Sequence, residues 1–200
     1  MKTILGLKSH SGWAALVVVS FAGEELEVID RRRIELVSDV DRGWAKQPYH
    51  AAEPLESDEA RVLVKRAIAS AQQYANKEMR AAVKRARNAG YDVAACAVLV
   101  GDPMPDWTVD EILAVHFRMH KAEGALFQDV LCRAAERCGL SLTKVSVKGL
   151  AAEAKQVFGA GTKSVQNKID AMRKVIGSPW GTDQKEAALA AAIAWRRSVS

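Results

Sequence analysis

The chain has 200 residues, of which 49% are hydrophobic and 26% are charged. This length supplies one well-buried core and is too short for two α/β domains of ordinary size, so we expect a single domain spanning residues 1–200. The formal net charge of +5 favours an anionic partner, either nucleic acid or an acidic membrane surface.

The same composition disfavours membrane-anchored and disulfide-linked proteins. No apolar window approaches the roughly 20 residues of a membrane-spanning helix. The three cysteines, Cys96, Cys132 and Cys138, are odd in number and lack metal-ligand spacing, which favours free thiols in a reducing compartment. We therefore expect a cytoplasmic protein without an anchor.

The first 37 residues have the pattern of three antiparallel strands. Residues 3–7 and 13–19 are β-rich runs joined by the polar turn 8–12, which predicts a hairpin. The second run is apolar throughout, so we expect it at the centre of the sheet. Residues 25–37 alternate between apolar and polar side chains and predict a third strand, bent or bulged at Arg31–Arg33.

The next segment, residues 40–57, predicts a linker-like loop because it contains Gly43, Pro48 and Pro54. A long helix is then expected over residues 57–88, with an N-cap candidate at its start, acidic residues in its first turn and basic residues in its last. Apolar positions of this helix mark one face: Val62, Ile68, Tyr74, Met79 and Val83.

The remainder alternates between strands and helices. Residues 93–100 predict a buried parallel strand, residues 108–138 a second long helix with any kink at Gly124, and residues 142–147 a fifth strand. Helical segments follow at 151–158, 163–176 and 182–197. Patterning alone therefore indicates a mixed α/β fold.

The second half also resembles a known family. Lys155 and Gln156 precede a turn with Gly159 and Gly161, Lys163 opens the next helix, and the last helix begins with two acidic residues three apart. This order, with the N-terminal hairpin, resembles the RuvC-type Holliday-junction resolvases of the RNase H-like superfamily, over about the first 20 residues and residues 93–197. The resemblance implies a five-stranded mixed sheet, a three-strand antiparallel meander plus two parallel strands, flanked by helices. It also implies a homodimer formed through a long helix.

The resemblance further implies metal-dependent chemistry. RNase H-like nucleases hold two divalent metals with carboxylates, so that one ion activates a water and the other stabilises the leaving oxygen. The position of the family's first carboxylate is Lys8 here, and a protonated lysine cannot ligate Mg²⁺. Asp102 is a shifted substitute for the second carboxylate, and Asp183 and Glu186 match the final pair. In an active enzyme these three acids would hold Mg or Mn.

Each of these residues also has a structural interpretation. Asp183 follows the candidate cap Thr182 and would stabilise a helix N-terminus in any protein. Asp102, which precedes a proline, suits an ordinary loop. Lys8 either contacts phosphate in a metal-free site or forms an ion pair with Asp183 or Glu186, and we favour the ion pair because a charge buried near two acids needs a partner.

Two further groups of residues are candidates for binding roles. Lys155 and Lys163 match family positions that face the DNA backbone, and Lys148 and Lys168 lie nearby; the alternative is a solvated basic face. A second group, His116, His120 and Glu123, shares one helix face, but without a recognised motif we expect only a partly buried helix surface.

Three functions follow, in order of preference. The first is a RuvC-like protein that binds branched or duplex DNA and whose nuclease activity is lost or weakened, a pseudoenzyme; Lys8 motivates it. The second is an active Mg- or Mn-dependent, structure-selective endonuclease that uses Asp102, Asp183 and Glu186. The third is a non-catalytic scaffold for protein interactions.

Overall fold

The computed structural model describes residues 2–23 and 25–199 and contains one five-stranded sheet in the order β3-β2-β1-β4-β5. Antiparallel pairing joins β1 to β2 and β2 to β3, whereas β4 runs parallel to β1 and β5 runs parallel to β4. The predicted meander with two added parallel strands is therefore confirmed. The strands are β1 (Lys2–His10), β2 (Trp13–Ala22), β3 (Glu25–Glu35), β4 (Asp92–Val100) and β5 (Ser141–Ser146).

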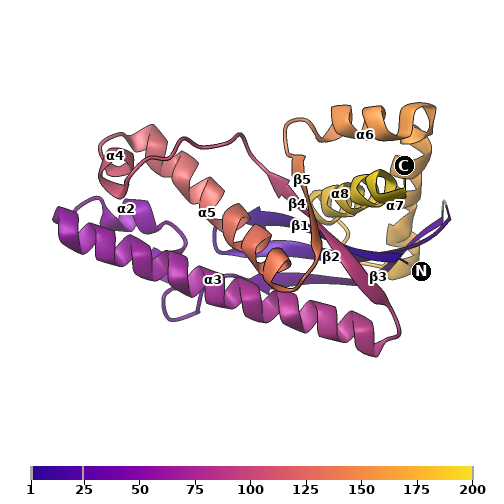
Figure 1. Cartoon of the computed structure of the whole chain (residues 1–200), viewed down its shortest axis with the longest axis horizontal. Coiled ribbons are helices and arrows are strands. Elements are labelled where there is room, and N and C mark those ends of the chain that lie inside the picture. The colour runs from indigo at the N-terminus through magenta and orange to yellow at the C-terminus, as the bar shows by residue number, and fades with distance from the viewer. Residues whose placement is uncertain (1, 24, 200) are drawn as a thin grey trace.

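Helices cover both faces of this sheet (Figure 1). One core lies between the sheet and α3, α5 and the short helices, and the other lies between the sheet and α6, α7 and α8. Among the described residues, no helix combines the length and apolarity needed to cross a bilayer. The helices are α1 (Arg42–Ala45), α2 (Pro48–Ala52), α3 (Ser57–Asn88), α4 (Val109–Leu113), α5 (His116–Arg137), α6 (Leu150–Phe158), α7 (Thr162–Ile176) and α8 (Thr182–Val199), with a 3₁₀ turn (Gly159–Gly161) between α6 and α7.

The alternation of β1 places its residues in different cores. Leu5 and Leu7 belong to the core under α3 and α5, whereas Ile4 belongs to the core under α8. Gly6 shares the α8 side, and a Cβ on it would clash with the backbone carbonyl of Ala187. Only glycine lets α8 approach β1 this closely, and this approach brings the first turn of α8 over the end of β1.

The long helix α3 has the predicted bounds but a different buried face. Val62 is 68% exposed, and of the predicted face only Met79 and Val83 are buried. The N-cap position is Glu56, without a side-chain bond, and Ser57 is already helical. Alanines dominate the buried face because their small side chains let neighbouring elements pack closely. Its buried residues are Ala60, Val64, Ala67, Ala71, Ala75, Met79, Ala82, Val83 and Ala86.

Three other predictions are corrected. Residues 40–57 contain α1 and α2, so this segment is not simply a loop. The strand irregularity lies between Val18 and Val19, opposite residues 28–30, while Arg31–Arg33 pair in regular register with residues 15–17. The helix expected over 108–138 is two helices, because Val115 is extended and separates α4 from α5. Gly124 lies within α5.

Candidate functional site

The candidate site lies where the parallel strands end. Since β1, β4 and β5 run in the same direction, their carboxyl ends meet at one edge of the sheet. Lys8 lies near the end of β1, Asp102 follows β4, and Lys148 follows β5. In open α/β sheets ligands bind outside this edge. The contact of α8 with Gly6 adds the acidic first turn of that helix to the same place.

Lys8 forms ion pairs with both acidic residues of α8. Its Nζ atom lies 2.9 Å from Asp183 Oδ1 and 2.7 Å from Glu186 Oε2. The three side chains are only 17%, 26% and 31% exposed, so water screens these pairs incompletely. The predicted ion pair is therefore present. Thr182, the predicted cap, is instead the first residue of α8.

The pKa values of this cluster record the same contacts. Partial burial alone would lower the pKa of Lys8, but hydrogen bonds to Glu186 and Asp183 outweigh it and raise that pKa above its usual value. Partial burial would raise the pKa of Asp183, but Lys8 and His10 hold it below its usual range. The lysine is therefore cationic and Asp183 anionic at neutral pH.

Sequence analysis missed three neighbours of this cluster. His10 Nε2 lies 3.1 Å from Asp183 Oδ2, and the His10 ring stacks on Trp13 with centroids 4.3 Å apart. The guanidinium carbon of Arg33 lies 4.1 Å from the centre of the Trp13 ring, within the range of a cation–π contact. The available signal was strand alternation, because His10 follows Lys8 by two residues and so shares its side of β1.

Asp102 does not complete a three-carboxylate metal site. Its exposed carboxylate lies 2.5 Å from Lys148 Nζ, and this contact lowers the pKa of Asp102. Within residues 2–23 and 25–199, the ligand atoms of Asp102, Asp183 and Glu186 do not gather within 4.8 Å of one another. A pair of divalent ions bound by oxygen ligands does not fit these residues, since the ammonium group of Lys8 lies against both carboxylates of α8.

The predicted DNA-contacting lysines differ in their surroundings. Lys155 on α6 and Lys163 at the start of α7 are both exposed. Lys168 is half-buried with its Nζ 2.8 Å from Glu25, and Lys148 contacts Asp102. Lys155 and Lys163 are therefore the better placed of the four to contact an external phosphate.

Arg31 has a structural role that the sequence did not indicate. Its Nη2 atom donates hydrogen bonds to the carbonyls of Ile176 at 2.6 Å and Ser178 at 3.0 Å, and its Nε donates to Pro179 at 2.9 Å. A cation at these carbonyls stabilises the C-terminal end of α7. The arginine therefore fastens α7 to the edge strand β3.

The structure also gathers three histidines away from α8. His116 and His120 on α5 meet His50 on α2, and one ring nitrogen of each lies within 4.8 Å of the others. Glu123, which sequence analysis grouped with the α5 histidines, is buried and contacts His50 instead. His50 was missed because it is remote in sequence and falls in the segment predicted as a loop.

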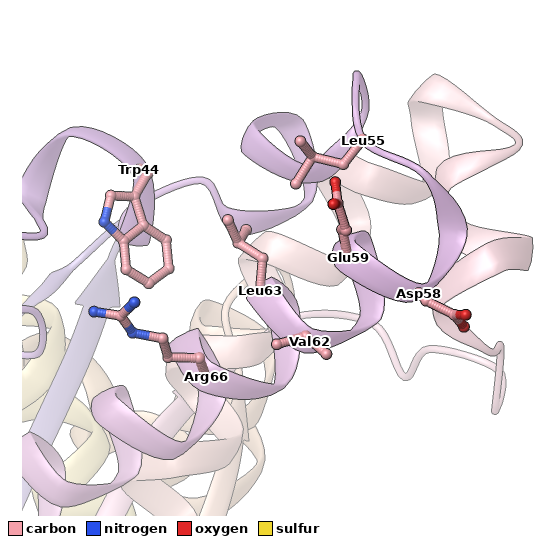
Figure 2. A pocket seen from close by; sticks show the side chains of 7 residues that line it. All are labelled: Trp44, Leu55, Asp58, Glu59, Val62, Leu63 and Arg66. Atoms are coloured by element: carbon pink, nitrogen blue, oxygen red, sulfur yellow. The ribbon is translucent and has the colours of Figure 1, made fainter.

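A separate apolar pocket lies beside the N-terminal half of α3. Figure 2 shows Leu55, Val62 and Leu63 around it, with the Arg66 guanidinium facing the Trp44 ring. The guanidinium carbon lies 5.3 Å from the centre of that ring. The pocket contains none of the residues predicted to bind DNA or metal.

The sheet order and the helices on both faces define the RNase H-like fold, in its RuvC-like form. The Thermus thermophilus RuvC structure aligns with 98% of this chain and 95% of its own, at 11% sequence identity and a TM-score of 0.54. A structure of T. thermophilus RuvC in complex with a Holliday junction substrate aligns with 100% of this chain and 96% of its own, at 12% identity and a TM-score of 0.52. No protein-family model and no curated protein matches the chain. At such low identity the likeness shows the fold.

Proposed function

We propose that this chain is a RuvC-like nucleic-acid-binding protein that recognises branched or duplex DNA and has lost metal-dependent cleavage. The observation that carries the proposal is the contact of Lys8 with both Asp183 and Glu186. An ammonium group has three N–H donors and no lone pair to offer a metal ion. Its charge also neutralises the carboxylates that would attract Mg²⁺ or Mn²⁺.

Binding without cleavage is supported by fold and charge. The chain shares its fold with a RuvC protein whose structure was solved with a Holliday junction substrate. Its formal charge is +5, and Lys155 and Lys163 are exposed on adjacent helices, α6 and α7. Phosphate contacts need cations near the DNA backbone rather than a strict motif, so two accessible lysines on helices that contact each other suit this role.

The binding test compares a labelled four-way DNA junction with a linear duplex and a single strand at low salt. Lys155→Glu/Lys163→Glu should weaken binding and reduce the slope of log K against log salt by about 2, one for each lost phosphate contact. The control is Lys2→Glu/Lys65→Glu, which makes the same charge change at two exposed lysines elsewhere. Equal losses in both variants would show that only net charge matters.

The cleavage test uses the same DNA with Mg²⁺ or Mn²⁺. The unmodified protein should bind and leave every substrate intact, while Lys8→Asp replaces the cation with a third carboxylate and should restore metal binding there. Cleavage by the unmodified protein, abolished by Glu186→Ala, would instead establish the active endonuclease. Absence of affinity for any of the three DNAs at low salt would favour the scaffold, because phosphate-driven binding is strongest there.

The homodimer expected from the family resemblance also belongs to this proposal. The N-terminal half of α3 exposes Val62 beside the apolar pocket of Figure 2, which supplies surface for a helix-mediated contact. A second copy of the chain would remove this apolar surface from water.

A further inference from the structure

We propose that His50, His116 and His120 form a binding site for one divalent transition-metal ion, for which Zn²⁺ is the best chemical match. The site shares no residue with the Lys8 cluster and does not depend on the proposed DNA-binding function. It joins α2 to α5 at the end of the molecule where α4 also lies (Figure 1).

The ring nitrogens are spaced as metal ligands require. His116 Nε2 and His120 Nε2 lie 3.1 Å apart. Two nitrogens bound tetrahedrally at about 2.0–2.1 Å from zinc would be roughly 3.3 Å apart, so almost no movement is needed. The ring centroid of His50 lies 5.2 Å from that of His116 and 4.6 Å from that of His120, so the third imidazole packs against the first two.

The local fold explains how two of these rings come together. After α4 ends at Leu113, Val115 is extended and interrupts the helix, so α5 begins at His116. His116 and His120 are then one helical turn apart on the same face. Proline at the first position of α2 starts a second short helix, and this helix packs against α5 with His50 facing the pair.

Glu123 orients the third ligand. Both carboxylate oxygens lie 2.9 Å from His50 Nδ1, and the His50 backbone N–H donates to Oε1 at 3.2 Å. With its proton held on Nδ1 by the carboxylate, His50 presents the lone pair of Nε2 as a ligand. Glu123 is only 4% exposed, and a buried carboxylate behind an imidazole is the arrangement that fixes the tautomer of metal-bound histidines and increases their basicity.

The donor set selects the class of ion. Three imidazole nitrogens suit Zn²⁺, Co²⁺, Ni²⁺ or Cu²⁺, whereas Mg²⁺ and Ca²⁺ require oxygen ligands. His116 and His120 are exposed, so an ion reaches the site from solvent and keeps a coordination position for water. The structural alternative is a hydrogen bond between these two rings together with a His50–Glu123 ion pair, which needs no metal.

Calorimetric titration of the metal-free full chain with ZnCl₂ tests the proposal, and CoCl₂ adds a visible absorption spectrum that reports tetrahedral nitrogen ligation. One equivalent of Zn²⁺ should bind. His120→Ala and His50→Ala should each weaken binding about 100-fold or more, and Glu123→Gln about 10–100-fold. The control is His10→Ala, which removes the fourth histidine of the chain and should leave both affinity and stoichiometry unchanged.

His120 is exposed, so His120→Ala should keep the native circular dichroism and remain interpretable. The absence of one-to-one Zn²⁺ and Co²⁺ binding would overturn the proposal and leave the hydrogen-bonded alternative. Binding that survives both His50→Ala and His120→Ala, or that is lost in His10→Ala, would equally overturn it by placing the ion elsewhere.

Discussion

Replacing Lys8 with methionine removes a cation from between two partly buried carboxylates while keeping most of the side-chain volume. The Nζ atom lies 2.9 Å and 2.7 Å from its partners. Exposed ion pairs contribute about 0–1 kcal/mol, and breaking a fully buried pair costs about 3–5 kcal/mol. With exposures of 17–31%, and with two carboxylates left facing each other, we expect Lys8→Met to lower the free energy of unfolding by about 2–3 kcal/mol.

The matched control is Lys185→Met on α8, the helix that carries Asp183 and Glu186. Lys185 Nζ lies 2.7 Å from Asp170 Oδ1, but these side chains are 37% and 59% exposed. This change should cost less than about 1 kcal/mol. Urea unfolding at neutral pH measures both variants against the unmodified chain, with linear extrapolation to water. For a chain of this size the Lys8 loss corresponds to a fall in Tm of about 4–12 °C. Equal losses in the two variants would refute the reasoning.

The effect of Lys8→Met should also depend on pH. The pKa of Asp183 is lowered in the folded chain, so its contribution is complete above the unfolded value of about 3.9 and is lost as the pH falls through the folded value. The pKa of Lys8 is raised, so its contribution is complete below about 10.4 and is lost as the pH rises through the folded value. The difference in the free energy of unfolding between Lys8→Met and the unmodified chain should therefore be largest between about pH 5 and 9 and should shrink in acid.

Other consequences can be measured separately. Gly6→Ala should destabilise the chain by at least about 2 kcal/mol, because the added methyl group meets the Ala187 carbonyl. Gly124→Ala, with open space around it on α5, should stabilise the chain by about 0.5–1 kcal/mol. Urea unfolding measures both changes. Zn²⁺ at about 100 times its Kd should raise the free energy of unfolding by about 2.7 kcal/mol and the Tm by about 5–11 °C. Both increases should be absent in His120→Ala. Light scattering should show a dimer that Val62→Glu converts to a monomer with native circular dichroism, since Val62 is 68% exposed in the single chain; an unchanged dimer would place the interface elsewhere.

Local patterns predicted the elements well because their signals are strong. The helix over 57–88 has acidic residues in its first turn, basic residues in its last and a glycine after its end, and its observed bounds are Ser57–Asn88. The strand segments follow period-2 or continuous apolar runs, so the pattern predicted five strands and a mixed α/β fold, while the arrangement of the sheet was predicted from the family resemblance. Lys8 stood out because the resemblance required an acid at that position.

Packing and long-range contacts were harder to predict from the sequence. Alanine suits either face of a helix, so the alanine stripe of α3 becomes visible only when neighbouring elements are placed against it. The spacing of His116 and His120 predicts that they share one helix face. It does not predict that His50 lies beside them, because His50 is 73 residues before its partner Glu123. Asp102 follows its strand as expected, yet the direction of a loop side chain depends on its partner, here Lys148.

The two charge clusters solve the same electrostatic problem in different ways. Carboxylates removed from water need a compensating cation, which can be a bound metal ion or a protein side chain. At the end of β1 the chain supplies that cation itself. Lys8 is part of the chain, so its ammonium group lies at the carboxylates of Asp183 and Glu186 whatever the metal concentration. On α5 the buried Glu123 carboxylate contacts the His50 ring and the His50 backbone N–H, and an ion bound by the three histidines would add positive charge beside it. Metal dependence should therefore be found at the three histidines and not at the Lys8 cluster.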